Sequence, residues 1–281
     1  PFGAMITFVY NSESKEEEKD SSENANDQAP QNENSNKVKV EIFDSDLNKI
    51  RTLNVKAKNG LNRIYWNLSR KGVRIPSWEE QVTSKDEPEG PQVKPGKYLV
   101  KISYANYQDS TWVTVLQDPR LEISLDEIEI REQEIEKVQN LMELASRTIS
   151  QLKKAYRNID LILDKIKTDE NFSDLRKTLN EEKNNIKQLA EEFYFINPKG
   201  IKSDPSKIVS RIYRVQNYLI SNPGRPNQMY YLSFKQAKES LEKVIDKVNL
   251  YFEKDWKKLI EIINSSKLTI IEEIPPIKNK P

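Results

Sequence analysis

The chain has 281 residues, of which 32% are charged, and its 45 Lys and Arg nearly balance its 44 Asp and Glu to give a formal net charge of +1. This length accommodates about two domains, and the balanced charge lacks the basic excess of nucleic-acid-binding domains. The chain has no His and no Cys, which excludes Ser-His-Asp triads, thiolate nucleophiles, disulfides and zinc sites built from these residues. We therefore predict no catalytic residue, no metal ligand and no cofactor.

The first residues predict a β-strand over 4–10. No signal peptide precedes it, so we expect the chain to be the C-terminal piece of a longer protein. Residues 11–36 follow with eight carboxylates, two lysines and no large apolar side chain. Such a segment buries too little surface to offset its ordering entropy, so we predict a disordered acidic insertion. Attraction of a basic partner or of calcium ions is the alternative to a plain solvated loop.

Residues 1–117 are predicted to form an antiparallel, Ig-like β-sandwich. Alternating apolar residues indicate strands over 37–42, 50–55, 61–68, 97–104 and 110–116, with a short strand near Gln81 and an irregular loop between Leu68 and Pro95. Trp66 shares its strand face with Ile64 and Leu68 and is predicted to lie in the core. The first two of these strands make a hairpin, with its turn over residues 44–48.

This turn has the first three ligand spacings of a calcium loop, at Asp44, Asp46 and Asn48. Lys49 occupies the position that requires glycine, and Val55 stands where the loop requires a glutamate. We therefore expect a plain hairpin turn.

After a linker over 118–123 the pattern changes from a period of two to one of three or four, which indicates helices. Ser124 and Glu127 form a predicted capping box at the start of a helix that reaches about residue 167. Its expected coiled-coil-like seam is Ile135, Val138, Met142, Ala145, Ile149, Leu152, Tyr156, Ile159, Leu163 and Ile166. No apolar run approaches the roughly 20 residues that a transmembrane helix needs.

Three further helices complete a predicted three- or four-helix bundle over 124–266. Ser173 is expected to cap the second and Asp204-Pro205 to open the third, and the fourth is expected to run unbroken from about 228 to Asn264. The two shorter helices either form one broken rod or pack as separate members. Residues 267–281, rich in proline, are predicted to be an extended tail.

Several short motifs together resemble the C-terminal region of bacterial sortilin-like, BNR-repeat "glycosyl hydrolase" proteins. They are Phe2–Tyr10, Gly60–Asn67, Gly90-Pro91, Pro95–Tyr98, Asp118–Arg120 and Arg225-Pro226. In that family a β-propeller precedes an Ig-like sandwich and a helical region. The chain departs from it at Asn67, where the family usually has Asp, and at the acidic insertion, where the family has a short loop.

The resemblance implies a non-catalytic accessory region that positions a propeller or mediates protein association, in a protein exported to the periplasm, cell surface or medium. No family catalytic residue can be carried over, because any hydrolase site would lie in the propeller. A glycan-binding module is the first alternative and part of a glycoside hydrolase the second.

Trp78 is the candidate ligand-contact residue, because an exposed aromatic ring in a loop can stack on a sugar. We expect it instead to anchor its loop against the sandwich. The acidic pairs Glu79-Glu80 and Glu191-Glu192 lack by themselves the separation across a cleft that glycosidases need. The tyrosines and tryptophan near the last helix, Tyr230, Tyr231, Tyr251 and Trp256, are expected to pack.

Overall fold

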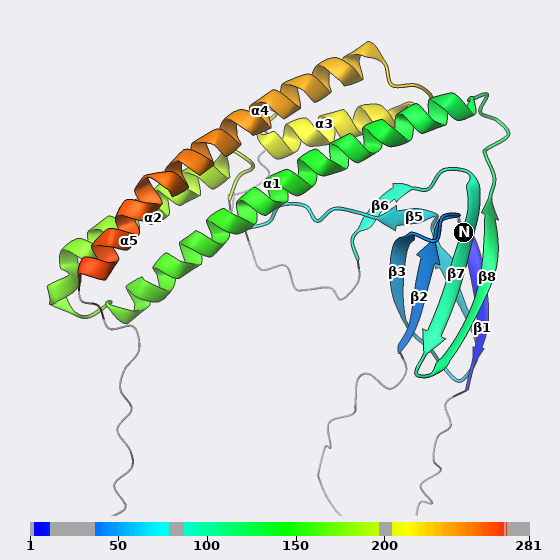
Figure 1. The fold of residues 1–281 in the computed structure, drawn as a ribbon, viewed down its shortest axis with the longest axis horizontal. Helices are drawn as coiled ribbons and strands as arrows, with labels where there is room; N and C mark the ends of the chain where they lie inside the picture. Colours follow the sequence, from blue (N-terminus) through cyan, green and yellow to red (C-terminus); the bar gives the residue numbers. More distant parts are fainter. Residues whose placement is uncertain (1–2, 12–36, 79–86, 197–203, 267, 269–281) are drawn as a thin grey trace, which may run out of the picture. The chain divides into compact units, whose positions relative to one another are not determined.

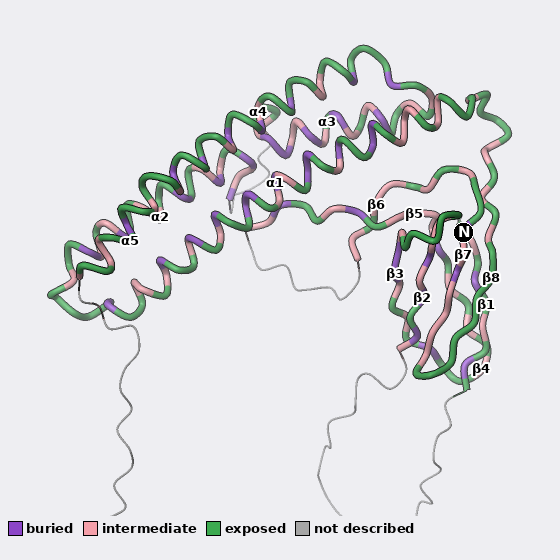
Figure 2. Tube along the Cα trace, viewed as in Figure 1, coloured by how far each residue is buried: buried purple, intermediate pink, exposed green. Residues whose placement is uncertain are grey.

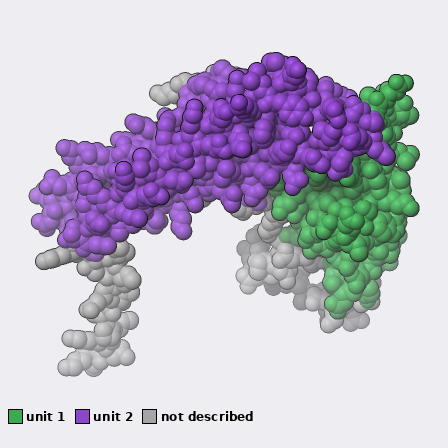
Figure 3. Space-filling view, turned by 45° about the horizontal axis from the view of Figure 1, so that its top comes forward, with its two compact units in different colours: residues 1–73, 81–123 green, residues 74–80, 124–281 purple. Residues whose placement is uncertain are grey.

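The computed structural model describes residues 3–11, 37–78, 87–196, 204–266 and 268. The chain divides into two compact units, shown in different colours in Figure 3. The β unit comprises residues 1–73 and 81–123, and the helical unit comprises 74–80 and 124–281. Residues 74–80 thus group with the helices, although sequence had assigned them to the β domain. The acidic insertion from residue 12, the strand near Gln81 and nearly all of the tail lie outside the described residues.

The described part of the β unit contains three antiparallel sheets, and a two-stranded and a four-stranded one share a core. Of these two, one sheet pairs β1 (Ala4–Tyr10) with β4 (Gly60–Trp66). The other has four strands in the order β3 (Lys49–Lys56), β2 (Lys37–Phe43), β7 (Gly96–Tyr104), β8 (Tyr107–Val115), which are labelled in Figure 1. The strands follow from the alternation of apolar and polar residues, since successive side chains point to opposite faces. Buried side chains from both sheets form the core: Ile6, Tyr10, Val38, Val40, Ile42, Ala57, Trp66, Tyr98 and Val100.

Trp66 lies at the centre of this core, as its position in the strand predicted. Its side chain is fully buried, and its ring packs edge-to-face on Tyr98 with 5.5 Å between centroids. The indole Nε1–H donates to the carbonyl of Ser69 at 2.8 Å, so burial leaves no polar atom of the ring unsatisfied.

A short antiparallel pair of strands, β5 (Ser69–Lys71) and β6 (Glu89–Gln92), occupies part of the segment after Leu68 that was predicted to be an irregular loop. Two facing glycines permit it, because a Cβ on Gly72 would clash with the Glu89 carbonyl and one on Gly90 with the Lys71 carbonyl. These glycines were expected to be loop residues, whereas they allow two backbones to approach closely.

The helical unit begins with α1 (Leu125–Lys165), a helix of 41 residues. The predicted capping box is confirmed: Ser124 accepts from the Glu127 amide, and the Glu127 carboxylate accepts from the Ser124 amide. All predicted seam residues are buried except Tyr156 and Leu163, which are half-buried. Figure 2 shows these buried positions recurring along α1.

Two shorter helices lie beside α1, one after the other. They are α2 (Ser173–Glu191) and α3 (Ile208–Ser221), and backbone bonds from Ile208 and Val209 to the carbonyls of Glu192 and Phe193 connect their ends. The expected cap at Ser173 is wrong. A 3-10 turn over Glu170–Phe172, capped by Asp169, precedes α2 and makes Ser173 its first helical residue.

The last predicted helix is divided into α4 (Gln228–Glu253) and α5 (Asp255–Ser265). The expectation of one helix is therefore wrong at one residue, because the backbone angles of Lys254, φ −110° and ψ −69°, depart from the usual helical values while they stay in the right-handed region. Asn227 caps α4 by accepting from the Tyr230 amide at 3.0 Å. Within the described residues, no helix combines the length and apolarity required to cross a membrane.

Candidate functional site

The β1–β4 outer face, which we define as Met5, Thr7, Val9, Leu61, Arg63 and Tyr65, exposes apolar side chains to solvent. The strand register pairs Met5 with Tyr65, Thr7 with Arg63 and Val9 with Leu61. The four apolar members are exposed to 54% (Met5), 66% (Val9), 67% (Leu61) and 45% (Tyr65). Large apolar side chains exposed close together on one face are characteristic of interaction surfaces.

Local contacts order this face without covering it. The Tyr65 hydroxyl donates to Met5 Sδ at 3.6 Å across the two strands. Arg63 lies between the two apolar pairs and is exposed. The face therefore offers apolar surface on both sides of a guanidinium, an arrangement that suits an apolar partner surface carrying a carboxylate.

Alternation in the sequence distinguishes the two faces of β4, but it does not show which β1 side chains are exposed beside them. Residues 4–10 are apolar at nearly every position, so the pattern does not tell which face is buried. The register of β1 with β4 is the signal that could have identified the site. Leu61 and Tyr65 face away from Trp66, so the β1 residues that pair with them lie on the same outer face.

Trp78 packs on α1 of the helical unit, to which residues 74–80 belong, whereas the sequence predicted that it anchors its loop against the β domain. Its ring, half-buried, meets Tyr156 of α1 edge-to-face with 5.1 Å between centroids. Lys183 of α2 stands 4.6 Å from the Tyr156 ring centroid and forms an ion pair with Asp160. Burial alone lowers the pKa of Lys183, but the hydrogen bond to Asp160 and the neighbouring Tyr156 outweigh it, and the net pKa is raised. Ligand contact at Trp78 stays a prediction.

Buried polar groups in the helical unit bind one another. Glu134 of α1 accepts from the Tyr230 hydroxyl at 2.9 Å and from Lys137 Nζ at 2.8 Å. Burial, with the hydrogen bond to Glu134, raises the pKa of Tyr230 above its usual range, so this hydroxyl remains protonated and acts as a donor. The arrangement holds α4 on α1 and offers no activated nucleophile.

The acidic pairs behave as separate groups where they are described. Glu192 forms an ion pair with Lys247 at 3.0 Å, while the Glu191 carbonyl accepts from Lys207. Glu79-Glu80 lies outside the described residues. In the ranges that the structure covers, no cluster of three or more acidic side chains could hold a metal ion.

The turn over residues 44–48 is a hairpin turn, as predicted. The Asp44 carboxylate accepts from the amides of Asp46 and Asn48 at 3.0 and 2.8 Å and from the Asn48 side chain. Leu47 adopts φ 62°, which the turn requires. The carboxylate oxygens of Asp44 thus satisfy amides of their own turn.

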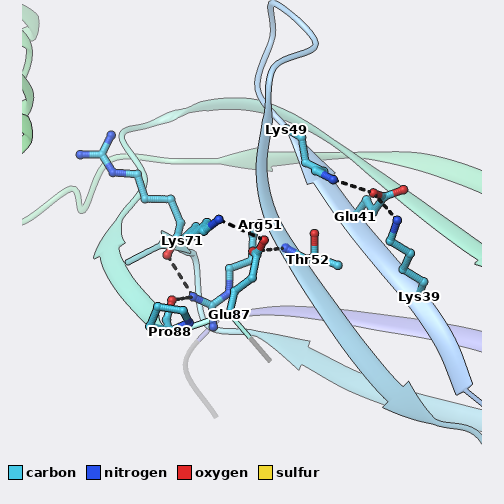
Figure 4. Close-up of polar contacts among 9 residues, drawn as sticks. Lys39, Glu41, Lys49, Arg51, Thr52, Lys71, Glu87 and Pro88 are labelled. Carbon is cyan, nitrogen blue, oxygen red and sulfur yellow. Dashed lines mark hydrogen bonds and ion pairs between the residues drawn. The ribbon is translucent and has the colours of Figure 1, made fainter. Parts of the chain in front are cut away.

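A polar cluster occupies the β3 edge of the four-stranded sheet (Figure 4). Buried Arg51 donates through Nη1 to the carbonyls of Arg70 and Pro88 at 3.0 and 2.9 Å, and Glu87 accepts from the Thr52 amide at 2.8 Å. Glu41 pairs with Lys39 and Lys49, and the hydrogen bond from Lys39 is the main cause of its lowered pKa. These groups bind one another and stabilise the edge.

Comparison with known proteins identifies no relative. No family model, no curated protein and no solved structure matches the chain. The resemblance to sortilin-like proteins therefore rests on the short motifs in the sequence alone, and the β1–β4 outer face is the surface feature from which a function can be argued.

Proposed function

We propose that this chain is a non-catalytic region that associates with another protein through the β1–β4 outer face. In this proposal the β unit is an Ig-like sandwich, and the helices form a bundle of three rods in which α2 and α3 make up the broken middle one. The observation that carries the proposal is the exposure of four apolar side chains, Met5, Val9, Leu61 and Tyr65, on one sheet face.

The magnitude of burial suggests what kind of partner this is. Full burial of a large apolar side chain is worth about 1.5–3 kcal/mol, and these four are already about half covered, so the face would gain about 3–6 kcal/mol. Association of free proteins costs about 4–15 kcal/mol in lost freedom. Burial of this face alone thus suits a partner held at a high effective concentration by the same polypeptide.

We propose that this partner is a β-propeller domain of the same exported protein, which is what the resemblance implies. Arg63, at the middle of the face, calls for a carboxylate on the opposing surface. Any hydrolase activity would then belong to the propeller, and the present chain would position that domain or connect it to other proteins.

A single polypeptide that joins the proposed propeller domain to this chain tests the proposal, because the linkage supplies the effective concentration that the face requires. Small-angle X-ray scattering should show a compact particle, and Leu61→Lys should extend it, because the variant places an ammonium beside Arg63 in the interface. Leu161→Lys is the matched control, since Leu161 is 70% exposed on α1 and lies outside the face. An extended particle without any substitution, or equal dimensions of the two variants, would count against the proposal.

A further inference from the structure

The two edges of the four-stranded sheet differ sharply in how they are protected. The β3 edge carries Lys49, Arg51 and Lys56, has a register shift beside it at Ile42/Phe43, and has the Thr52 amide covered by Glu87. Charges, bulges and covering groups are the devices by which proteins prevent an edge strand from pairing with another chain.

The β8 edge has fewer of these devices: Asp109, which binds the Ser110 amide, is the one such group in the strand. Its nine residues, Tyr107–Val115, pair with β7 without a register shift and contain neither Lys, Arg nor Pro; Asp109 is its one charged residue. Among the described strands, β7 is the one that pairs with β8. The edge is therefore long, regular and nearly uncharged.

The hairpin fixes which β8 amides point outward. Tyr104 and Tyr107 flank a two-residue turn and form its hydrogen-bonded pair, and such pairs alternate along an antiparallel ladder. The residues that direct their backbone groups away from β7 are therefore Gln108, Ser110, Trp112 and Thr114. The Ser110 amide agrees with this, because it binds the Asp109 carboxylate at 2.7 Å and not a strand.

An apolar row crosses the outer face of this sheet and ends at the same edge. Phe43 of β2 is opposite Leu99 of β7, and Leu99 is opposite Trp112 of β8. Trp112 is 54% exposed, although tryptophan has much apolar surface to bury. The next row is polar, with Glu41 opposite Lys101 and Lys101 opposite Ser110.

We propose that the chain self-associates through β8, with β8 of a second copy pairing antiparallel about a two-fold axis at Trp112. This register joins outward-facing amides of both copies and sets Ser110 opposite Thr114 of the second copy. It continues the row Phe43–Leu99–Trp112 into the same row of the other sheet and brings no like charges opposite one another. A second copy is thus the occupant that matches the edge in hydrogen bonding, apolar pattern and charge.

This association uses a surface distinct from the β1–β4 outer face, so the two proposals can fail separately. Sedimentation over a wide range of concentrations should show a monomer–dimer equilibrium. Trp112→Lys, which places two ammonium groups at the axis, should weaken the dimer at least tenfold, whereas Trp112→Phe should retain it. Circular dichroism of both variants checks that the fold is kept.

Disulfide cross-linking tests the register, and the lack of native cysteine makes the result clean. Chains with Ser110→Cys mixed with chains with Thr114→Cys should form a disulfide dimer, since opposed residues of a hydrogen-bonded pair are about 5.5 Å apart at Cα, within the disulfide range. Either variant alone should not form this disulfide. The two identical cysteines of such a dimer would be offset by four residues along the strand, about 13 Å. A chain monomeric at all concentrations, or equal cross-linking with and without mixing, overturns the proposal.

Discussion

The hydroxyl of Tyr230 on α4 donates to a carboxylate oxygen of Glu134 on α1 at 2.9 Å, although the two residues are 96 positions apart in the chain. Both are buried, with exposed fractions of 0% and 7%. The other Glu134 oxygen accepts from Lys137 at 2.8 Å. This bond joins the first long helix to the fourth inside the helical unit.

Removal of that hydroxyl should destabilise the protein. Tyr230→Phe leaves a buried carboxylate without one of its donors, and such a loss costs about 1–3 kcal/mol. Tyr231→Phe is the matched control. Tyr231 is 44% exposed, so the loss of its hydroxyl should change the free energy of unfolding little. Urea unfolding of both variants measures the difference, and equal stabilities would contradict the structural role of the bond.

The same tyrosine should make stability fall at alkaline pH. Burial and the bond to Glu134 raise the folded-state pKa of Tyr230 above its unfolded value of about 10. Its contribution is complete below about pH 10 and is lost as the pH rises toward the folded-state pKa, because the unfolded chain releases this proton first. Unfolding free energies should therefore decline above pH 10 more steeply in the wild type than in Tyr230→Phe. Parallel curves would refute the assignment.

Removal of the Tyr194 hydroxyl should not destabilise the protein, in contrast to removal of the Tyr230 hydroxyl. Its hydroxyl oxygen is buried without a hydrogen-bond partner among the described residues, and burial raises its pKa to about 12. Removal of an unsatisfied buried group relieves a desolvation cost of about 1–3 kcal/mol, so Tyr194→Phe should be neutral or stabilising. Thermal unfolding compares it with the wild type. A marked loss of stability would show that the hydroxyl has a partner.

Arg51 should hold the β5–β6 pair beside β3. Its Nη1 bridges the carbonyls of Arg70 and Pro88, which a lysine ammonium cannot reproduce with the same planar geometry. Arg51→Lys should cost about 1.5–3 kcal/mol and speed amide hydrogen exchange at Gly72, which donates to Pro88. Arg63→Lys, at an exposed site, is the control. Unchanged exchange at Gly72 in Arg51→Lys would contradict this role.

The spacing of residues in the sequence predicted the elements that depend on contacts between residues close together in the chain. Ser124 and Glu127 carry their cap within four residues, and the α1 seam needs only a stripe of apolar side chains at the helical repeat. Trp66 was placed in the core because Ile64 and Leu68 share its face. In each case the deciding contacts follow from local spacing.

The errors arose where the deciding contact comes from elsewhere in the chain. Gly72 and Gly90 read as loop residues until paired, and Trp78 gives no indication in sequence that its partner is Tyr156. Lys254 interrupts the last helix although its neighbours continue the apolar pattern. The exposed face was missed for the same reason, because the burial of β1 depends on its register with β4.

Oxidation of methionine in a polypeptide that joins this chain to the proposed propeller domain tests most directly whether the β1–β4 outer face is covered. Met5 lies on the face at 54% exposure, Met229 is 52% exposed on α4, and Met142 is buried. Under dilute peroxide, mass spectrometry should show Met5 oxidised several times more slowly in the joined polypeptide than in the present chain, while Met229 is oxidised at the same rate in both. Equal oxidation of Met5 in the two proteins would contradict the proposed association.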